Sequence, residues 1–384
     1  RAARSRRPPV KHFRQTQRAH LVSHIQYMAH AISLAQKGLY TTDPNPRVGC
    51  VLVKDGVIVG EGYHRKAGEG HAEVNALAMA GEKARGATAY VTLEPCIHFG
   101  RTPPCSDGLI KAGVSHVVCA MQDPNPEVAG KGFAKLQAAG IELTSGILED
   151  QARALNPGFI KRMETGLPFV RLKMASSLDG RTAMQSGESQ WITGPSARSD
   201  VQKLRARSSA IITGINSIFQ DDSSLTVRAA ELGFDDADFA EFVAQRQPLR
   251  VVLDSQGRLP KNAKILQQSG DTLIVVKHGV QLQVEAEVIP LAADENGLAL
   301  SAVLHELSRR NCNEVLIETG ATLAGAFIEA GLVDEMVLYM APCFMGSDAR
   351  PLLTMPITKM AEKHTLNISD MRMVGEDIRL TITF

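Results

Sequence analysis

The sequence predicts an α/β protein of two domains, and three observations support this. The chain has 384 residues, enough for two separate hydrophobic cores. Apolar strand-like runs alternate with helix-like segments, which is typical of α/β folds. The alternation is interrupted over residues 148–167, a helical stretch that leads into Gly166-Leu-Pro168. We therefore expect a first domain over 20–147, a connector over 148–167 and a second domain over 168–384.

The first domain is expected to be a three-layer sandwich around one sheet. Residues 20–38 carry apolar side chains at helical spacing. Asp55-Gly56 between two apolar runs predicts a β-hairpin. Residues 71–81 are rich in Ala and Leu, which predicts a helix. The expected elements are helix 20–38, strands 48–53 and 57–62, helix 71–81, strand 86–94, helix 105–113, strand 116–121, helix 132–140 and strand 141–145.

The second domain repeats the alternation of strands and helices. The expected strands are 169–175, 209–213, 250–254, 272–276, 314–318, 335–341 and 379–384, and the expected helices are 196–206, 302–310 and 322–331. Residues 229–247 are rich in acidic side chains and are expected to form a surface insertion. No internal repeat is present.

His71, Cys96 and Cys105 predict a zinc site. One imidazole and two thiolates leave a fourth position for water, which is the pattern of catalytic rather than structural zinc. Glu73 lies two residues after His71 and predicts a proton shuttle beside a water that the metal activates, as in zinc-dependent base deaminases. Cys105 follows two prolines at an expected helix start, so we expect a depressed thiol pKa there.

Taken singly, these motifs are weak. A His-x-Glu triplet is common by chance, and both Cys96 and Cys105 would also suit a buried core. The usual deaminase signature has two residues between its cysteines, whereas eight separate them here. The combination, with a strand or helix expected around each part, favours a zinc deaminase, and the longer loop points to a particular subfamily.

Composition limits the partners. The chain carries 42 Lys and Arg against 41 Asp and Glu, but residues 1–19 are basic without any acidic residue. We expect a disordered basic leader there, while a targeting segment or nucleic-acid arm stays open.

No apolar run could span a bilayer and the six cysteines show no disulfide framework, so we expect a cytoplasmic protein without membrane or nucleic-acid partners. Buried thiols are expected at Cys50, Cys119, Cys312 and Cys343.

A second site is predicted where Glu318-Thr-Gly320 follows an apolar strand and opens a helix. Glycine permits close backbone approach, and the N–H groups of a helix start bind phosphate. The turn lacks the GxGxxG dinucleotide fingerprint, so alone it is equally a tight structural turn. Support comes from polar segments at 176–181 and 186–191, and from 221–228, which ends in a basic residue.

With these residues together, the chain resembles the bifunctional riboflavin-biosynthesis deaminase–reductase family over about residues 20–384. The shared motifs are Pro44–Gly49, His71–Glu73, Cys96–Cys105, Asp123–Pro126, Ser177–Thr182, Glu188–Trp191, Leu225–Arg228 and Glu318–Gly325. The resemblance implies a cytidine-deaminase-like first domain and a dihydrofolate-reductase-like second domain. It implies zinc-dependent deamination of 2,5-diamino-6-(5-phosphoribosylamino)pyrimidin-4-one, then NADPH-dependent reduction to 5-amino-6-(5-phosphoribitylamino)uracil.

The resemblance also implies site residues. In the first site, Asn45, His98 and Arg101 are expected to contact the pyrimidine substrate. In the second, Lys173 and Glu318 are expected beside the reacting imine. Expected substrate contacts there are Ser189, Arg205, Leu225, Arg228 and Glu318. Expected NADPH contacts are Ala175, Trp191, Ser217, Asp221, Ser255, Gly320, Ala321, Thr322, Leu323, Ala324, Gly325 and Ala326.

Two other functions were weighed. A nucleic-acid base deaminase of the tRNA-adenosine type is favoured by the basic leader but disfavoured by the long cysteine loop and by a second half without a basic stripe. A non-catalytic interaction protein is disfavoured by the intact set of His71, Glu73, Cys96 and Cys105. We expect one zinc per chain and a small-molecule substrate, and we leave a homo-oligomer open.

Overall fold

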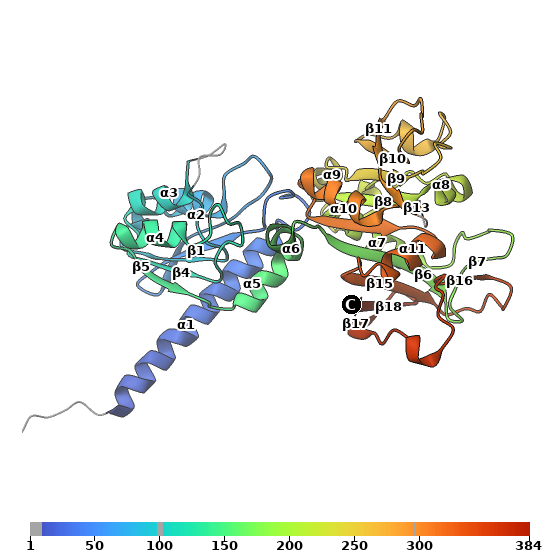
Figure 1. The fold of residues 1–384 in the computed structure, drawn as a ribbon. Helices are drawn as coiled ribbons and strands as arrows, with labels where there is room; N and C mark the ends of the chain where they lie inside the picture. The colour runs from blue at the N-terminus through green and yellow to red at the C-terminus, as the bar shows by residue number, and fades with distance from the viewer. Residues whose placement is uncertain (1–9, 98–102, 295–296) are drawn as a thin grey trace, which may run out of the picture. The chain divides into compact units, whose positions relative to one another are not determined.

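The computed structural model describes residues 10–97, 103–294 and 297–384. It divides into two compact units, Arg1–Glu164 and Thr165–Phe384. Figure 1 shows the elements of each unit along the chain. No described helix has the length and apolar character that crossing a membrane requires.

The first unit is built on a five-stranded sheet with the strand order β2-β1-β3-β4-β5. Strand β1 is antiparallel to β2 and β3, while β3, β4 and β5 are parallel. The elements are α1 (Val10–Gln36), β1 (Gly49–Lys54), β2 (Val57–Tyr63), α2 (Ala72–Ala80), a 3₁₀ turn (Gly81–Ala84), β3 (Thr88–Val91), α3 (Cys105–Ala112), β4 (His116–Cys119), α4 (Lys131–Ala138), β5 (Glu142–Ser145), α5 (Glu149–Leu155) and α6 (Pro157–Thr165).

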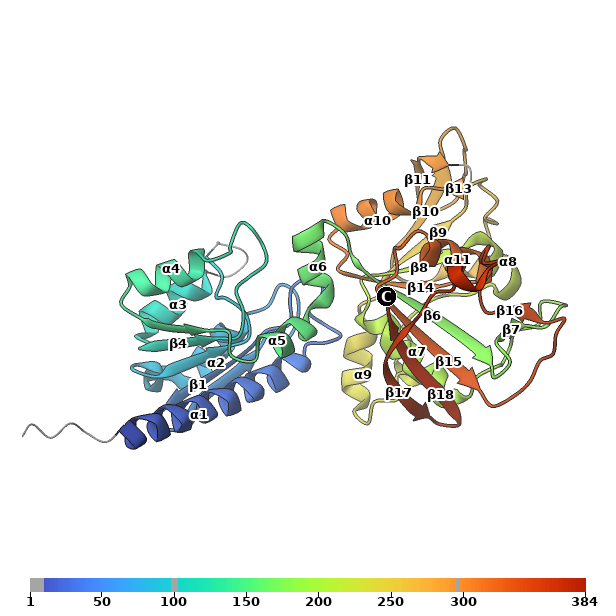
Figure 2. The ribbon, with the colours of Figure 1, turned by 60° about the horizontal axis from the view of Figure 1, so that its bottom comes forward.

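Helices cover both faces of this sheet, which confirms the three-layer prediction. Figure 2 shows α1 and α5 along one face and α3 and α4 along the other. Helix α2 packs closely on β2 because two glycines face it. A Cβ atom on Gly60 would lie 2.3 Å from the Ala76 carbonyl oxygen, and one on Gly62 would lie 2.6 Å from that of Ala72. This close approach sets the position of His71, which directly precedes α2.

Helix α1 begins at Val10, inside the segment 1–19 for which a basic leader is expected. No proline or glycine interrupts the chain between Val10 and Gln36, which suits a continuous helix. Residues 1–9 lie outside the described residues. The helical prediction for the connector corresponds to α5 and α6, and α6 begins at Pro157, a residue that suits the first position of a helix.

The second unit is built on a nine-stranded sheet with the order β11-β10-β9-β8-β14-β6-β15-β18-β17. Its elements are β6 (Phe169–Ser177), β7 (Arg181–Ala183), α7 (Pro195–Arg207), β8 (Ala210–Gly214), α8 (Ile215–Asp221), α9 (Ala237–Ala244), β9 (Leu249–Leu253), β10 (Thr272–Lys277), β11 (Glu287–Leu291), β12 (Ala293–Asp294), β13 (Gly297–Leu298), α10 (Leu300–Arg309), β14 (Glu314–Glu318), α11 (Ala321–Glu329), β15 (Glu335–Ala341), β16 (Arg350–Pro351), β17 (Asn367–Val374) and β18 (Asp377–Thr383), with 3₁₀ turns at Ala229–Glu231, Lys264–Gln267 and Met360–Glu362.

The seven strands from β11 to β15 in this order are parallel, so their carboxyl ends lie at one edge of the sheet. Helices α10 and α11 pack on one face, and α7 and α8 pack on the other. Ligands of open parallel sheets bind beyond the carboxyl ends of the strands. The second predicted site falls at this edge.

Several elements were not predicted. Strand β17 exposes almost every residue, so it lacks the apolar alternation by which a strand is recognised. The acidic insertion contains α9, whose start is capped by the Asp236 carboxylate through the Phe239 N–H. Three of the four expected buried thiols are buried, but Cys343 is exposed because it lies in the loop after β15.

Candidate metal centre and cofactor site

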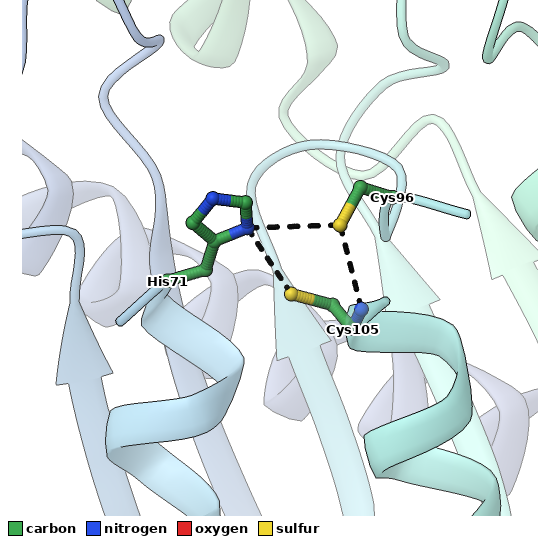
Figure 3. A group of neighbouring side chains, drawn as sticks. All are labelled: His71, Cys96 and Cys105. Carbon is green, nitrogen blue, oxygen red and sulfur yellow. Dashed lines mark hydrogen bonds between the residues drawn. The ribbon is translucent and has the colours of Figure 1, made fainter. Parts of the chain in front are cut away.

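The three predicted metal ligands meet at one point of the first unit. His71 directly precedes α2, Cys96 lies in the segment after β3, and Cys105 is the first residue of α3. Figure 3 shows the imidazole and both thiols facing one another. Among the described residues this is the one group of His, Cys, Asp or Glu that could hold a metal ion, with its ligand atoms all within 4.8 Å of one another.

The distances fit tetrahedral zinc. The Nδ1 atom of His71 lies 3.6 Å from the Cys96 sulfur and 3.3 Å from the Cys105 sulfur. In a tetrahedral site with Zn–S bonds of about 2.3 Å and Zn–N bonds of about 2.0 Å, a sulfur and a nitrogen ligand lie about 3.5 Å apart. The donor set therefore suits zinc, and three protein ligands leave a position for water.

The two thiols differ in acidity. Hydrogen bonds from Cys105 and His71 lower the pKa of Cys96 to about 4, and the backbone N–H of Cys105 donates to the same sulfur at 3.4 Å. The neighbouring Cys96 sulfur and burial raise the pKa of Cys105. The backbone N–H of Cys105 at the start of α3 thus serves the Cys96 sulfur. Two sulfurs this close favour a cation between them.

Glu73 lies beside the metal ligands in the first turn of α2. Its side chain is buried, and burial raises the pKa of this carboxyl to about 6. A carboxyl with a pKa near neutral can both take up and release a proton at physiological pH. Glu73 therefore has the acidity that a proton shuttle requires.

Asn45 lies near the metal ligands through an intermediate histidine. The His64 ring packs edge-on against that of His71, with centroids 5.3 Å apart. The Nδ1 atom of His64 lies 3.1 Å from the Gly70 carbonyl oxygen, so Nδ1 carries the proton and Nε2 accepts from the Asn45 amide at 3.1 Å. No pattern in the sequence singled out His64. The predicted contacts His98 and Arg101 lie outside the described residues.

Glu94 supports the segment that carries Cys96. Its buried carboxylate accepts hydrogen bonds from the backbone N–H groups of Asp123, Gly130 and Phe133 at 3.0–3.1 Å. These bonds tie the motif at 123–126 and the start of α4 to the residues just before Cys96. No prediction from the sequence included this role, although Glu94 directly precedes the Pro-Cys pair and is the one charged residue of its strand-like run.

In the second unit, Lys173 in the middle of β6 lies beside Glu318 at the carboxyl end of β14, and the two residues are paired in register. The Arg205 guanidinium of α7 binds both carboxylate oxygens of Glu318, at 2.6 and 2.9 Å. Burial opposes ionisation of Glu318, but Arg205 and Lys173 outweigh it and lower the Glu318 pKa. Burial lowers the pKa of Lys173. The arrangement places a partly buried lysine beside a carboxylate whose ionised form Arg205 stabilises.

The other expected substrate contacts are distributed around this pair. The Ser189 hydroxyl donates to Asp221 at 3.0 Å, which joins an expected substrate contact to an expected cofactor contact. Arg228 is exposed and forms an ion pair with Glu231 at 2.6 Å. The Leu225 side chain is buried in the core, so only its backbone is available to a ligand.

Expected cofactor contacts come from several strand ends and helix starts. Ala175 lies in β6, Ser217 and Asp221 in α8, and Ser255 after β9. Trp191 is 69% exposed, and the Arg198 guanidinium stacks on its ring at 4.6 Å. The exposed part of the Trp191 indole is therefore available for contact with a ligand.

The Gly320–Ala326 turn combines open and closed positions. Gly320 caps α11, and a Cβ atom there would meet nothing within 4 Å, so space for a ligand remains above the helix start. A Cβ atom on Gly325 would lie 2.1 Å from the Thr354 carbonyl oxygen, so this glycine serves packing. Ala324 is fully buried as well, whereas Gly320 and Thr322 are exposed and Ala321, Leu323 and Ala326 are partly exposed.

Known families match both units. The profile of the cytidine and deoxycytidylate deaminase zinc-binding region matches residues 21–121, and that of the RibD C-terminal domain matches residues 168–380. The riboflavin biosynthesis protein RibD of Escherichia coli K12 is 53% identical over 359 residues, which cover 92% of this chain and 97% of that protein. The RibD protein of Haemophilus influenzae is 51% identical over 360 residues, with 93% and 96% covered.

Solved structures agree. RibD of Acinetobacter baumannii superposes with a TM-score of 0.87 at 48% identity, covering 94% of this chain and 99% of that one. The Thermotoga maritima diaminohydroxyphosphoribosylaminopyrimidine deaminase/5-amino-6-(5-phosphoribosylamino)uracil reductase gives a TM-score of 0.82 at 30% identity, covering 95% and 99%. These matches confirm the predicted cytidine-deaminase-like and dihydrofolate-reductase-like domains. The chain is thus an enzyme with a zinc-binding deaminase domain and a reductase domain, and it belongs to the RibD family of riboflavin biosynthesis proteins.

Proposed function

We propose that this enzyme deaminates 2,5-diamino-6-(5-phosphoribosylamino)pyrimidin-4-one with zinc and then reduces the product with NADPH to 5-amino-6-(5-phosphoribitylamino)uracil. Residues 20–147 would carry the first step and residues 168–384 the second. The observation that supports this most directly is a three-ligand centre beside buried Glu73 in a chain whose second unit places Lys173 beside Glu318. The name of the Thermotoga maritima relative supports the choice of substrate.

In the first site, His71, Cys96 and Cys105 would hold one zinc ion per chain. Zinc in such a site supplies a Lewis acid and lowers the pKa of a water molecule, so that hydroxide is available near neutral pH. Glu73 would take a proton from the attacking water, whose oxygen bonds to the ring carbon. It would then pass protons to the ring nitrogen and to the exocyclic amine, which leaves as ammonia when its C–N bond breaks. Asn45 orients the pyrimidine, and we assign His98 and Arg101 to the rest of the substrate.

In the second site, Lys173 and Glu318 serve the reacting imine. NADPH would supply a hydride. The ribosylamine in its open form is an imine, so a hydride would add at C1′ and the nitrogen would need a proton. The Lys173 ammonium can donate that proton, and Glu318 holds the ammonium in place. Arg205 fixes the Glu318 carboxylate through two hydrogen bonds, and its other terminal nitrogen donates to the Thr226 carbonyl oxygen at 3.2 Å. We assign Arg205 to the substrate as well.

The cofactor would lie across the carboxyl ends of the parallel strands. The helix start at Gly320 offers backbone N–H groups to the pyrophosphate, and the open space above it admits this approach. Ser189, Leu225 and Arg228 are assigned to the substrate. The remaining NADPH contacts assigned are Ala175, Trp191, Ser217, Asp221, Ser255, Ala321, Thr322, Leu323, Ala324, Gly325 and Ala326, with Ala324 and Gly325 limited to backbone contact.

We propose a homo-oligomer, a cytoplasmic location, and no nucleic-acid or membrane partner. Strand β17 is an edge of the nine-stranded sheet, and it exposes Ile368, Met371 and Met373 by 55%, 70% and 61%. Exposed apolar groups on a sheet edge favour association with another chain. The match of the second unit to a reductase family disfavours a nucleic-acid base deaminase with an appended binding domain.

The direct test is product analysis. The purified full chain is incubated with the diaminopyrimidine phosphate, with and without NADPH, and the products are identified by mass spectrometry. We expect loss of ammonia without NADPH and the ribityl product with it. Release of ammonia from a tRNA or an oligonucleotide, with the pyrimidine phosphate unchanged, would refute the proposal.

A variant tests the metal assignment. Cys96→Ser should lose most of its zinc and its deamination, because serine replaces a thiolate ligand. Cys343→Ser, the same change at an exposed cysteine of the second unit, is the matched control and should keep its zinc. Full zinc content and surviving deamination in Cys96→Ser would make the ligand assignment wrong.

A further inference from the structure

The side chain of Asn156, between α5 and α6, binds both polar groups of one distant peptide position. Its Oδ1 atom accepts from the backbone N–H of Arg47 at 2.7 Å, and its Nδ2 group donates to the Arg47 carbonyl oxygen at 2.9 Å. An amide that satisfies the N–H and C=O of one residue acts as a neighbouring β-strand would. Both residues are almost fully buried, so these bonds are shielded from water.

The side chain of Arg47 also binds the segment that carries Asn156. The Arg47 guanidinium donates to the Leu155 carbonyl oxygen at 2.6 Å, at the last residue of α5, where a cation is favoured by the helix dipole. Leu155 and Ile160 on either side of Asn156 pack into the core of the first unit. The segment that precedes the second unit is therefore anchored to the loop before β1.

This loop carries Asn45, two residues before Arg47. The loop is held from within by the Asn45 N–H, which donates to the Thr42 carbonyl oxygen at 2.8 Å. The Asn45 side chain donates to His64, which leaves its amide oxygen for a substrate. An amide can orient a ring to within a fraction of an ångström only if its backbone is held equally well.

We infer that Asn156 is a positioning residue for pyrimidine binding: it holds the Arg47 backbone so that Asn45 faces the substrate. The inference rests on the proposed role of Asn45. It makes the segment between α5 and α6 part of the deaminase site, although the sequence analysis placed it in the connector.

The test uses the full-length enzyme. Asn156→Ala removes both bonds and should raise the KM for the diaminopyrimidine phosphate about tenfold, with kcat changed much less and zinc retained. Asn156→Asp keeps the bond to the N–H and should raise KM less. Ile160→Val, a buried change in the same segment, is the control for general loosening and should leave KM unchanged. An unchanged KM in Asn156→Ala would overturn the inference.

A double-mutant cycle separates the inference from the function on which it rests. If Asn156 acts through Asn45, adding Asn156→Ala to Asn45→Ala should raise KM by less than about twofold, because contacting partners are not additive. Full additivity would overturn the inference alone. A wild-type KM in Asn45→Ala would instead overturn the assignment of Asn45 and the inference with it. Reduction of the deaminated intermediate, measured on the same samples, should stay at the wild-type rate.

Discussion

The two sites differ in how the chain builds them. In the first unit, His71, Cys96 and Cys105 bring their ligand atoms within 4.8 Å of one another from two short segments. In the second, Lys173, Arg205 and Glu318 come from β6, α7 and β14, and the last two are 113 residues apart in sequence. One site is compact and the other is distributed over a sheet edge.

The difference reflects the ligands that each site would hold. A metal ion requires a few donor atoms of fixed type at fixed distances, so short motifs reveal it. A dinucleotide is bound in large part by backbone groups and space, which constrain residue identity weakly. The family resemblance predicted that Leu225 contacts the substrate and that Ala324 contacts NADPH, although the fold buries both side chains.

Metal removal should separate the two sites completely. A chelator that strips zinc from the full chain should abolish deamination, while reduction of the deaminated intermediate with NADPH continues, because the described residues of the second unit contain no group that could hold a metal. Added zinc should restore the first activity. Deamination at the normal rate in a metal-free sample would show that the first site does not work as a metal centre.

Glu73→Gln should separate metal binding from proton transfer within the first site. Glutamine keeps the shape of the side chain but cannot carry a proton, and general acid–base catalysis contributes about 10²–10⁴ in rate. We expect deamination to fall by that factor with zinc retained. Glu82→Gln, an exposed position shortly after α2, serves as the control. Normal turnover in Glu73→Gln would remove this residue from the mechanism.

Lys173→Ala should lower reductase turnover about a hundredfold, at the lower end of acid–base effects, while NADPH binding is largely kept. Binding is measured by quenching of Trp191, the only tryptophan. Lys363→Ala, at an exposed position of the same unit, is the control. Glu318→Gln should act like Lys173→Ala, with some loss of stability because Arg205 loses its ionised partner. If Lys173→Ala lost NADPH binding but kept normal turnover, Lys173 would serve the cofactor and not the reacting imine.

The smallest effect is expected in the turn after β14, where two glycines have different roles. Gly320→Val should fold normally and raise the KM for NADPH about tenfold, because its side chain enters the open space above α11. Gly325→Val should instead destabilise the fold by about 1–3 kcal/mol, because its side chain would overlap the Thr354 backbone. Thermal unfolding and NADPH titration distinguish the two, and a normal KM in Gly320→Val would contradict the pyrophosphate assignment.

Local pattern predicted most elements of the sheets and missed those without a regular pattern. Strand β17 was missed because it exposes both faces, and the start of α1 was placed too late because the run of basic residues was taken for a leader. The metal ligands were predicted as a group, since each is a side chain of distinctive chemistry. Glu94 and His64 were not, because their roles consist of hydrogen bonds to distant backbone and side-chain groups.

The sequence by itself determined the fold class, the donor set of the metal centre and the place of the second site after a strand, because spacing and side-chain chemistry are local properties. Only the tertiary structure decided that the Cys105 N–H donates to the Cys96 sulfur, that Gly325 serves packing, and that Asn156 binds Arg47. Each of these depends on atoms brought together from positions far apart in the chain, where burial and hydrogen bonding, and not residue type alone, set the properties of a group.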